Sequence, residues 1–274
     1  DDLMISNRGD HFFAVINASR KEIDCKYFKE NISKEIDIEL ISTRSLIAIQ
    51  GPKSEKILSS QIGELSSLNY LDVKNFTYNG EILWVSRSGY TGQDGFEISI
   101  PNSLCEVFCK SILEQKGIEP IGLGARDTLR LECGLCLYGQ DLNETITPIE
   151  AGLKWAIQKV RRTGGEREGG FTGQEKILAQ IDTPPSFKRE AFFPDGKAPL
   201  RSGTKLFSDD SGKNEIGLIT SGSYSPTLER PISMGYLNYT KFKVGDPIFG
   251  ELRSKFFPIK LTKLPFVPTS FKRN

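Results

Sequence analysis

Apolar and polar residues alternate, or form short β-branched runs, in several stretches of the first hundred residues. A period of two places neighbouring side chains on opposite faces of a strand. This pattern predicts strands at residues 11–18, 35–42, 45–50 and 95–101. A period near 3.6 predicts helices at residues 20–32, 54–63, 104–115 and 125–135. The first part of the chain is therefore expected to mix strands and helices.

Turn-forming residues divide the chain further. Asn79-Gly80 separates two apolar runs and predicts a tight β-hairpin, because both central residues of a type I′ turn need positive φ. A Gly-rich charged loop at residues 161–173 and a short helix at 175–181 precede Pro184-Pro185, which indicates a boundary. Beyond it, β-like runs alternate with Gly, Pro and Asn turns, which predicts a small antiparallel barrel or sandwich.

These patterns give an α+β fold class with two domains. The first is expected at residues 1–185, with residues 151–185 as a connecting segment, and the second at residues 186–274. Membrane helices are not expected, because no apolar run exceeds six residues.

Charge and composition narrow the chemistry. The net charge of +1 hides an asymmetry, because residues 1–150 carry 15 Lys+Arg and 23 Asp+Glu, whereas residues 151–274 carry 21 and 12. A basic second half favours a partner-binding surface, although two domains that merely differ in surface charge remain an alternative. The basic residues are not interleaved with a nucleic-acid-binding module, so nucleic acid is not expected as a partner. His11 is the single histidine, so catalysis must rest mainly on carboxylates, Arg, Lys or Tyr.

Four of the five cysteines occur in two close pairs, Cys105 with Cys109 and Cys133 with Cys136. Together they have the residue types of a zinc site. Both pairs lie among leucines and other apolar residues, however, which favours buried free thiols and a reducing compartment. No metal site is therefore expected.

Polar residues gather in three places. Residues 88–97 combine turn-forming glycines with Tyr90 and with Glu97, which begins a strand and could accept two parallel N–H donors from a ring edge. Residues 121–157 place Arg126 on one helix face with Arg130, and their acidic residues, Asp141 among them, are expected in a solvated loop. Asp1 and Asp2 open the chain, and on an extended backbone only one of them can face a given site.

Five strings, in order, resemble the T-protein of the glycine cleavage system over essentially the whole chain. They are GYTGQDGFEISIP, GLGARDTLRLECGLCLYGQDL, TPIEAGLKWAI, GLITSGSYSPTLERPISMGYL and LPFVPT. The SPTL and PFVPT segments look like the eukaryotic, mitochondrial branch, so a mitochondrial matrix location is expected. Compared with the family, the chain lacks an N-terminal stretch that would carry any targeting segment.

The resemblance implies aminomethyl transfer. Such proteins take an aminomethyl group from lipoylated H-protein and pass the one-carbon unit to tetrahydrofolate with release of ammonia; the P- and L-proteins of the system are indirect partners. Neither a metal nor pyridoxal phosphate is used in this subunit. The family fold is a three-lobed clover-leaf whose central hole holds folate, with a C-terminal antiparallel β-barrel as its third lobe.

The resemblance also assigns site residues. Asp2 matches the catalytic second Asp of a GG-x-x-DD-L motif, where it would orient the attacking folate amine. The folate-binding positions it implies are Asn17, Val15, Tyr90, Glu97, Arg126, Trp155 and Arg201. Phe13 beside Val15 contributes packing, and Trp155 has a core position as its alternative.

Two other functions compete with this one. A folate domain of the kind fused to dimethylglycine or sarcosine dehydrogenases would share the fold, but those relatives lack the match in GLCLYGQDL. A non-catalytic folate-binding factor for iron–sulfur assembly would carry a Cys in a K-G-C-x-x-G-Q context, which no Cys of this chain has.

Overall fold

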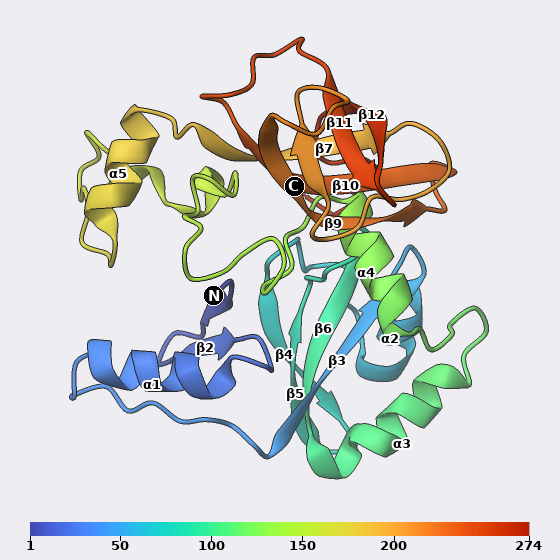
Figure 1. The fold of residues 1–274 in the computed structure, drawn as a ribbon. Helices are drawn as coiled ribbons and strands as arrows, with labels where there is room; N and C mark the ends of the chain where they lie inside the picture. The colour runs from blue at the N-terminus through green and yellow to red at the C-terminus, as the bar shows by residue number, and fades with distance from the viewer. Residues whose placement is uncertain (274) are drawn as a thin grey trace. The chain divides into compact units, whose positions relative to one another are not determined.

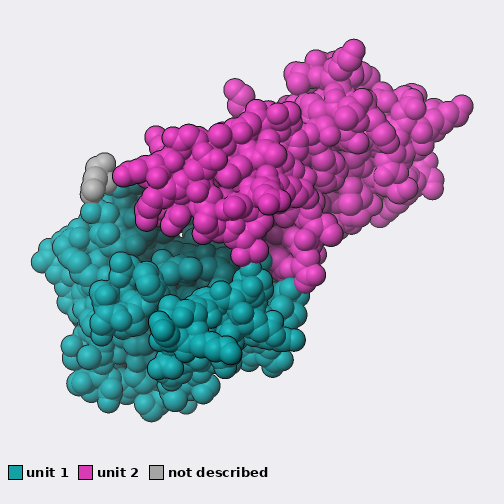
Figure 2. Space-filling view, turned by 90° about the vertical axis from the view of Figure 1, so that its left-hand side faces the viewer, with its two compact units in different colours: residues 1–130, 268–274 teal, residues 131–267 magenta. Residues whose placement is uncertain are grey.

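The structure is a computed structural model that describes residues 1–273, and its chain contacts divide it into two compact units (Figure 2). The first unit comprises Asp1–Arg130 with the tail that begins at Pro268, and the second comprises Leu131–Val267. The helices and strands of both are labelled in Figure 1. None of the helices among residues 1–273 has the length and apolar character to cross a membrane.

A four-stranded antiparallel sheet forms the centre of the first unit. Its strands, in spatial order, are β3 (Arg44–Gln50), β6 (Gly95–Pro101), β5 (Glu81–Ser86) and β4 (Val73–Tyr78). One face packs on helices α2 (Ser54–Ile62) and α3 (Asn102–Leu113), as Figure 1 shows. Alternation explains this face, because Leu83, Val85, Phe96, Ile98 and Ile100 are fully buried. The opposite face carries the intervening residues, among them Trp84 and Glu97.

The hairpin between β4 and β5 has the predicted turn. Asn79 and Gly80 have φ values of 51° and 85°, and Tyr78 pairs with Glu81 across the turn. This is the positive-φ pair that a two-residue connection requires. Helices α2 and α3 also confirm the helices expected at residues 54–63 and 104–115.

The remaining elements of the first unit lie at its start and end. They are strands β1 (Met4–Asn7) and β2 (Phe12–Val15), which form a two-stranded sheet, and helices α1 (Lys21–Asn31) and α4 (Leu123–Glu132), whose last two residues belong to the second unit. The strand predicted at residues 35–42 is wrong. Those residues have no strand conformation, and Ile36 and Leu40 are 58% and 49% exposed. Alternation alone does not make a strand where no neighbouring strand supplies hydrogen bonds.

The second unit is built on a closed antiparallel barrel, so a barrel and not a sandwich is confirmed. The barrel order is β10 (Arg230–Asn238), β7 (Phe187–Pro194), β12 (Lys255–Thr262), β11 (Ile248–Leu252), β8 (Lys205–Phe207) and β9 (Glu215–Ser225). Close strand packing requires glycine at Gly222, where an added Cβ would lie 1.7 Å from the carbonyl oxygen of Leu200. Two short 3-10 helices, Lys154–Ala156 and Lys159–Arg161, and helix α5 (Gln174–Asp182) precede the barrel. The boundary expected at residues 185/186 stays a prediction.

Two buried acids attach the end of α4 and the segment after it to the barrel. Glu132 accepts hydrogen bonds from the hydroxyls of Ser225 (2.5 Å) and Thr227 (2.8 Å). Asp141 accepts from the hydroxyls of Thr220 and Ser221 and is fully buried. The expectation that Asp141 lies in a solvated loop is therefore wrong, because its carboxylate satisfies barrel hydroxyls that would otherwise be buried without acceptors.

The five cysteines are free thiols. Cys136 is buried in a small apolar cluster, as the sequence indicated, and Cys105 and Cys109 are half-buried on α3. Burial, with a smaller contribution from Cys105, raises the pKa of the Cys109 thiol. Within residues 1–273, no group of three or more His, Cys, Asp or Glu side chains is placed to hold a metal ion.

Candidate active site

The hairpin β1–β2 carries several candidate residues on one face. Met4 pairs with Val15, and Ser6 pairs with Phe13. Side chains two residues apart share a face of a strand, so Met4, Ser6, Phe13 and Val15 lie on one face of the hairpin. Asp2 and Asn17 lie just outside the two strands and are joined by a side-chain hydrogen bond. The predicted catalytic residue Asp2 is therefore held by the predicted folate-binding residue Asn17, two positions after Val15.

The side-chain amide of Asn17 holds the acidic pair at the start of the chain. Its Nδ2 donates to Oδ1 of Asp1 (2.7 Å), to Oδ1 of Asp2 (2.9 Å) and to the carbonyl oxygen of Asp2 (3.3 Å). The expectation that only one of the two carboxylates faces a given site is wrong, because residues 1–3 are not in a strand. Asp2 remains exposed while one of its oxygens is fixed by a neutral donor.

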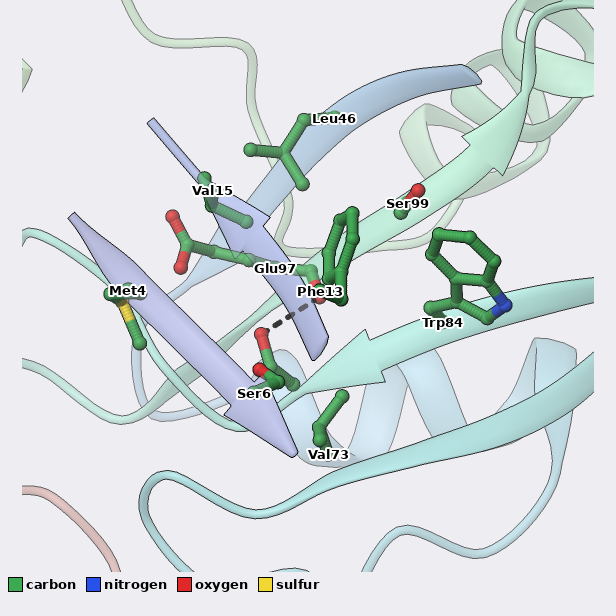
Figure 3. A pocket seen from close by; sticks show the side chains of 10 residues that line it. Met4, Ser6, Phe13, Val15, Leu46, Val73, Trp84, Glu97 and Ser99 are labelled. Atoms are coloured by element: carbon green, nitrogen blue, oxygen red, sulfur yellow. Dashed lines mark hydrogen bonds between the residues drawn. The ribbon is translucent and has the colours of Figure 1, made fainter. Parts of the chain in front are cut away.

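A small cavity of about 20 Å³ lies between this face of the hairpin and the outer face of the four-stranded sheet (Figure 3). Met4 and Val15 lie toward one end of the view and Trp84 toward the other. The full lining is Met4, Ser6, Phe13, Val15, Leu46, Val73, Trp84, Ser86, Glu97 and Ser99. Phe13 meets the Trp84 ring edge-on at 4.9 Å between centroids, so it closes one side by packing, as expected.

Glu97 projects from β6 into this cavity and is held by a chain of serines. The buried hydroxyl of Ser88 donates to Oε2 of Glu97 at 2.7 Å. The hydroxyl of Ser86 lies 2.7 Å from that of Ser88 and 3.3 Å from the carbonyl oxygen of Glu97, the contact dashed in Figure 3. One carboxylate oxygen of Glu97 is therefore fixed by a neutral donor.

The Gly-rich segment between β5 and β6 is folded around the side chain of Gln50. Its Nε2 donates to the carbonyl oxygen of Ser88 (2.9 Å), and its Oε1 accepts from the hydroxyl of Thr91 (3.1 Å). A Cβ at Gly89 would lie 1.9 Å from Oε1 of Gln50, and one at Gly95 would lie 2.6 Å from its Cδ. Glycine is required at Gly95, because a Cβ there would also lie 2.7 Å from the backbone carbonyl oxygen of Ile49, whereas a side chain at Gly89 would displace the amide of Gln50.

The buried side chain of Arg87 also holds the Gly-rich segment in place. Its side chain is only 2% exposed, pairs with Glu55 (2.5 Å) and Asp94, and donates to the carbonyl oxygen of Leu68 (3.0 Å). Burial lowers the pKa of Arg87, but the hydrogen bonds and charges of Asp94 and Glu55 outweigh burial, so the net direction is upward. The guanidinium therefore stays charged and holds both ends of the segment.

Tyr90 and Arg126, two predicted folate-binding residues, contact each other. The Arg126 guanidinium lies over the Tyr90 ring, 4.5 Å from its centroid, which is a cation–π geometry. Arg130, one turn further along α4, is buried and pairs with Asp127 at 2.7 Å. The two arginines therefore have different surroundings: Arg126 lies over an aromatic ring, whereas Arg130 is buried in an ion pair that supports the fold.

The end of the chain returns to the Gly-rich segment. The backbone N–H of Ser270 donates to the carbonyl oxygen of Gly92 (2.9 Å), and Phe271 stacks on Tyr70 with centroids 4.1 Å apart. The Lys272 ammonium donates to the carbonyl oxygen of Ser66 at 2.6 Å. This tail restrains the turn that presents Tyr90.

The last two predicted residues belong to the second unit. Trp155 lies in the 3-10 helix Lys154–Ala156 and is 72% exposed, so the alternative that it is a core residue is wrong. Arg201 is exposed in the turn before β8. The roles of all eight site residues in catalysis or folate binding stay predictions.

Comparisons with known proteins decide the family. The family model described as the GCVT N-terminal domain matches residues 1–161, and that of the glycine cleavage T-protein C-terminal barrel domain matches residues 190–268. The chain belongs to the glycine cleavage T-protein family. The resemblance inferred from the five sequence strings is confirmed, and neither alternative function is favoured.

Individual relatives agree with this family. The mitochondrial aminomethyltransferase of Dictyostelium discoideum is 41% identical, over 100% of this chain and 70% of its own length. That of Saccharomyces cerevisiae is 38% identical, over 99% of this chain and 72% of its own. These names agree with the expected mitochondrial type.

A solved structure confirms the fold class. The crystal structure of the glycine cleavage system aminomethyltransferase T from Bartonella henselae superposes with a TM-score of 0.89 at 33% identity, covering 100% of this chain and 73% of that one. The α+β class and the C-terminal antiparallel barrel of the T-protein fold are therefore confirmed.

Sequence reasoning missed the residues that hold the candidate side chains. Gln50, Ser88 and Arg87 received no role, although each has a recognisable signal. Gln50 is a polar residue that ends an apolar strand, and Ser86 and Ser88 flank Arg87 with a period of two directly before the Gly-rich turn. Arg87 itself is a lone basic residue between two apolar strands.

Proposed function

We propose that this T-protein transfers a one-carbon unit from the aminomethyl group on lipoylated H-protein to tetrahydrofolate, giving 5,10-methylenetetrahydrofolate. The carbon leaves sulfur and nitrogen and forms two bonds to folate nitrogens, ammonia is released, and the lipoyl sulfur takes a proton. The observation that carries the proposal is that the hairpin β1–β2 lines the cavity of Glu97, while Asn17, just after β2, holds Asp2, just before β1.

Asp2 is proposed as the catalytic residue. The electrophilic carbon passes through an iminium-like, positively charged state, and a carboxylate beside it stabilises that charge more than it stabilises the neutral reactant. The amide of Asn17 fixes one oxygen of Asp2 at 2.9 Å. Because a neutral donor orients the carboxylate without cancelling its charge, Asp2 is suited to hold the attacking amine and to offset the developing charge.

Glu97 is proposed to bind the pterin ring of tetrahydrofolate. Its Oε2 is held by Ser88, so the carboxylate has a fixed plane from which to accept N–H donors of the ring edge. The cavity of about 20 Å³ has room for little more than a water molecule, so a ring enters only when flexible lining side chains such as Met4 move aside. Val15 and Asn17 would flank the ring.

The remaining predicted residues are proposed as contacts to the outer parts of folate. Tyr90 under Arg126 offers an aromatic face and a cation next to the Gly-rich turn. Trp155 offers an exposed ring, and Arg201 an exposed cation for the glutamate carboxylates. Neither a metal ion nor pyridoxal phosphate is required for this chemistry.

Lipoylated H-protein is proposed as the direct partner, with the P- and L-proteins connected through it. The basic second half of the chain supports this choice. Arg161 and Arg162 donate to carbonyl oxygens of their own loop, those of Gly169 (3.2 Å) and Ile157 (2.9 Å), so the loop presents its charges on an ordered backbone. Lys159 is exposed beside them.

An isosteric substitution tests the catalytic role. Asp2→Asn keeps the size of the side chain but removes its charge, so turnover with aminomethylated H-protein is expected to fall by roughly a hundredfold or more. Tetrahydrofolate affinity should stay within a few-fold. Asp1→Asn is the matched control, since Asp1 shares the Asn17 amide, and it should retain wild-type turnover. If Asp2→Asn turns over like wild type, Asp2 is not the catalytic residue.

A further inference from the structure

Beside Glu97, the buried Ser88 and the half-buried Ser86 form a hydrogen-bonded pair. Ser88 is 3% exposed, and its hydroxyl lies 2.7 Å from Oε2 of Glu97 and 2.7 Å from the hydroxyl of Ser86. A hydroxyl carries one proton and can accept two hydrogen bonds. Since a carboxylate oxygen can only accept, the proton of Ser88 must go to Glu97.

The proton of Ser86 then has two possible acceptors. The oxygen of Ser88 is 2.7 Å away, whereas the carbonyl oxygen of Glu97 is 3.3 Å away, so the shorter contact takes the proton. The result is a directed chain, from Ser86 to Ser88 to Glu97. Each bond in such a chain polarises the next, so the hydroxyl of Ser88 is a stronger donor than an isolated serine.

The backbone of Ser88 is fixed independently of its side chain. Nε2 of Gln50 donates to its carbonyl oxygen at 2.9 Å, and the neighbouring Arg87 is locked by its two ion pairs. A hydroxyl on so rigid a support can select one rotamer of the glutamate.

We propose that Ser88 is a positioning residue that sets the orientation of the Glu97 carboxylate for ring binding, with Ser86 acting through Ser88. This inference rests on the proposed function of Glu97. Without the Ser88 hydroxyl, the Glu97 carboxylate rotates among several orientations. A ring edge that needs both carboxylate oxygens in one plane must then fix one of these orientations on binding, and the lost conformational entropy weakens the affinity.

The test is a double-mutant cycle on tetrahydrofolate affinity, measured by calorimetry. Ser88→Ala is expected to raise Kd about tenfold, which corresponds to about 1.4 kcal/mol. Glu97→Ala is expected to raise it by at least as much. The double variant should bind no more weakly than Glu97→Ala alone, because Ser88 has nothing left to orient.

Folding is preserved in Ser88→Ala, because the proton of Ser86 can turn to the carbonyl oxygen of Glu97 and no buried donor is stranded. Ser233→Ala is the matched control. Ser233 is fully buried in the barrel and donates to the carbonyl oxygen of Leu200 at 2.9 Å, so its variant loses an equally buried hydroxyl. It should leave Kd unchanged.

Steady-state kinetics add a second readout. In Ser88→Ala the KM for tetrahydrofolate should rise while kcat at saturating folate stays within about twofold, since Asp2 is untouched. Ser86→Ala should raise KM less than Ser88→Ala does, because it only weakens the donor.

The possible outcomes distinguish the proposed role of Glu97 in ring binding from the positioning role of Ser88. If Glu97→Ala leaves affinity unchanged, the proposed role of Glu97 is wrong. If Glu97→Ala weakens binding but Ser88→Ala does not, or if the two losses add in the double variant, the role of Glu97 stands and the positioning role of Ser88 is refuted.

Discussion

Arg87 is the side chain whose removal should most damage the first unit. Its guanidinium is almost completely buried, lies 5.0 Å from the centroid of Phe96, and is the meeting point of α2, through Glu55, and the Gly-rich segment, through Asp94. It also donates to the carbonyl oxygen of Leu68 at 3.0 Å. Arg87→Ala deletes all of these contacts: Asp94 loses its guanidinium, and Glu55 keeps the Lys272 ammonium, 3.8 Å away.

The size of the effect follows from how well those carboxylates can rehydrate. Breaking a buried ion pair by removing one partner costs roughly 3–5 kcal/mol. The side chains of Glu55 and Asp94 are 32% and 20% exposed, so water can partly replace the guanidinium. We therefore expect the lower end, about 3 kcal/mol of the free energy of unfolding. Arg87→Lys keeps a charge but loses the planar fork, and should fall between wild type and alanine.

The assay is urea unfolding followed by the fluorescence of Trp84, which lies on the outer face of the same sheet. Tryptophan occurs at only two positions, so Trp155→Phe isolates this signal and serves as the parent for all variants. Arg167→Ala, at an exposed position, is the control and should change stability by no more than about 0.5 kcal/mol. If Arg87→Ala unfolds within about 1 kcal/mol of the parent, the buried ion pairs do not hold this unit together.

Three further outcomes are expected. The KM for H-protein should rise with salt, since salt screens the attraction between the basic half of the chain and charges of opposite sign on a partner; a KM insensitive to salt contradicts docking by the basic half. Phe271→Ala removes the stack on Tyr70 and should speed hydrogen exchange in the turn around Gly92, with exchange in the barrel as the internal control. Burial raises the pKa of Tyr236, and burial with the hydrogen bond to Glu190 raises that of Tyr239. Both tyrosines should therefore stay protonated near pH 10. The stability that they contribute is present below that pH and is lost as the pH rises toward their folded pKa. Absorbance at 295 nm measures tyrosine ionisation, and normal titration of all eight tyrosines would contradict the expectation.

Local pattern was enough for much of the fold. The Asn79-Gly80 turn and helices α2 and α3 were predictable because each is specified by residues within one element. Residues 35–42 failed because a strand needs a neighbour, and pattern contains no information on which segments become neighbours. The many short β-like runs predicted an antiparallel barrel or sandwich, but the choice between them and the strand order depend on the same missing information.

In the candidate site, too, some residues could be predicted from the sequence and others could not. Resemblance could name Asp2 and Glu97, because they lie in recognisable strings. It could not give Gln50 or Ser88 a role, because their importance comes from contacts across 41 and 9 positions of the chain, the first to Thr91 and the second to Glu97. Asp141 was misjudged for a related reason: an acid in a run with Glu144 and Glu150 looks solvated unless the barrel hydroxyls that contact it are known.

The first unit uses two different ways of holding a carboxylate, and the difference matters for function. Asp94 and Glu55 are paired with a buried arginine, which fixes them but cancels their charge. Asp2 and Glu97 are fixed by an amide and a hydroxyl, and neither has a basic partner within residues 1–130. A neutral donor sets direction while leaving the negative charge available to whatever approaches. Carboxylates that only support the fold have no need of this, whereas the roles proposed for Asp2, which offsets a developing cation, and for Glu97, which accepts ring N–H donors, both require it.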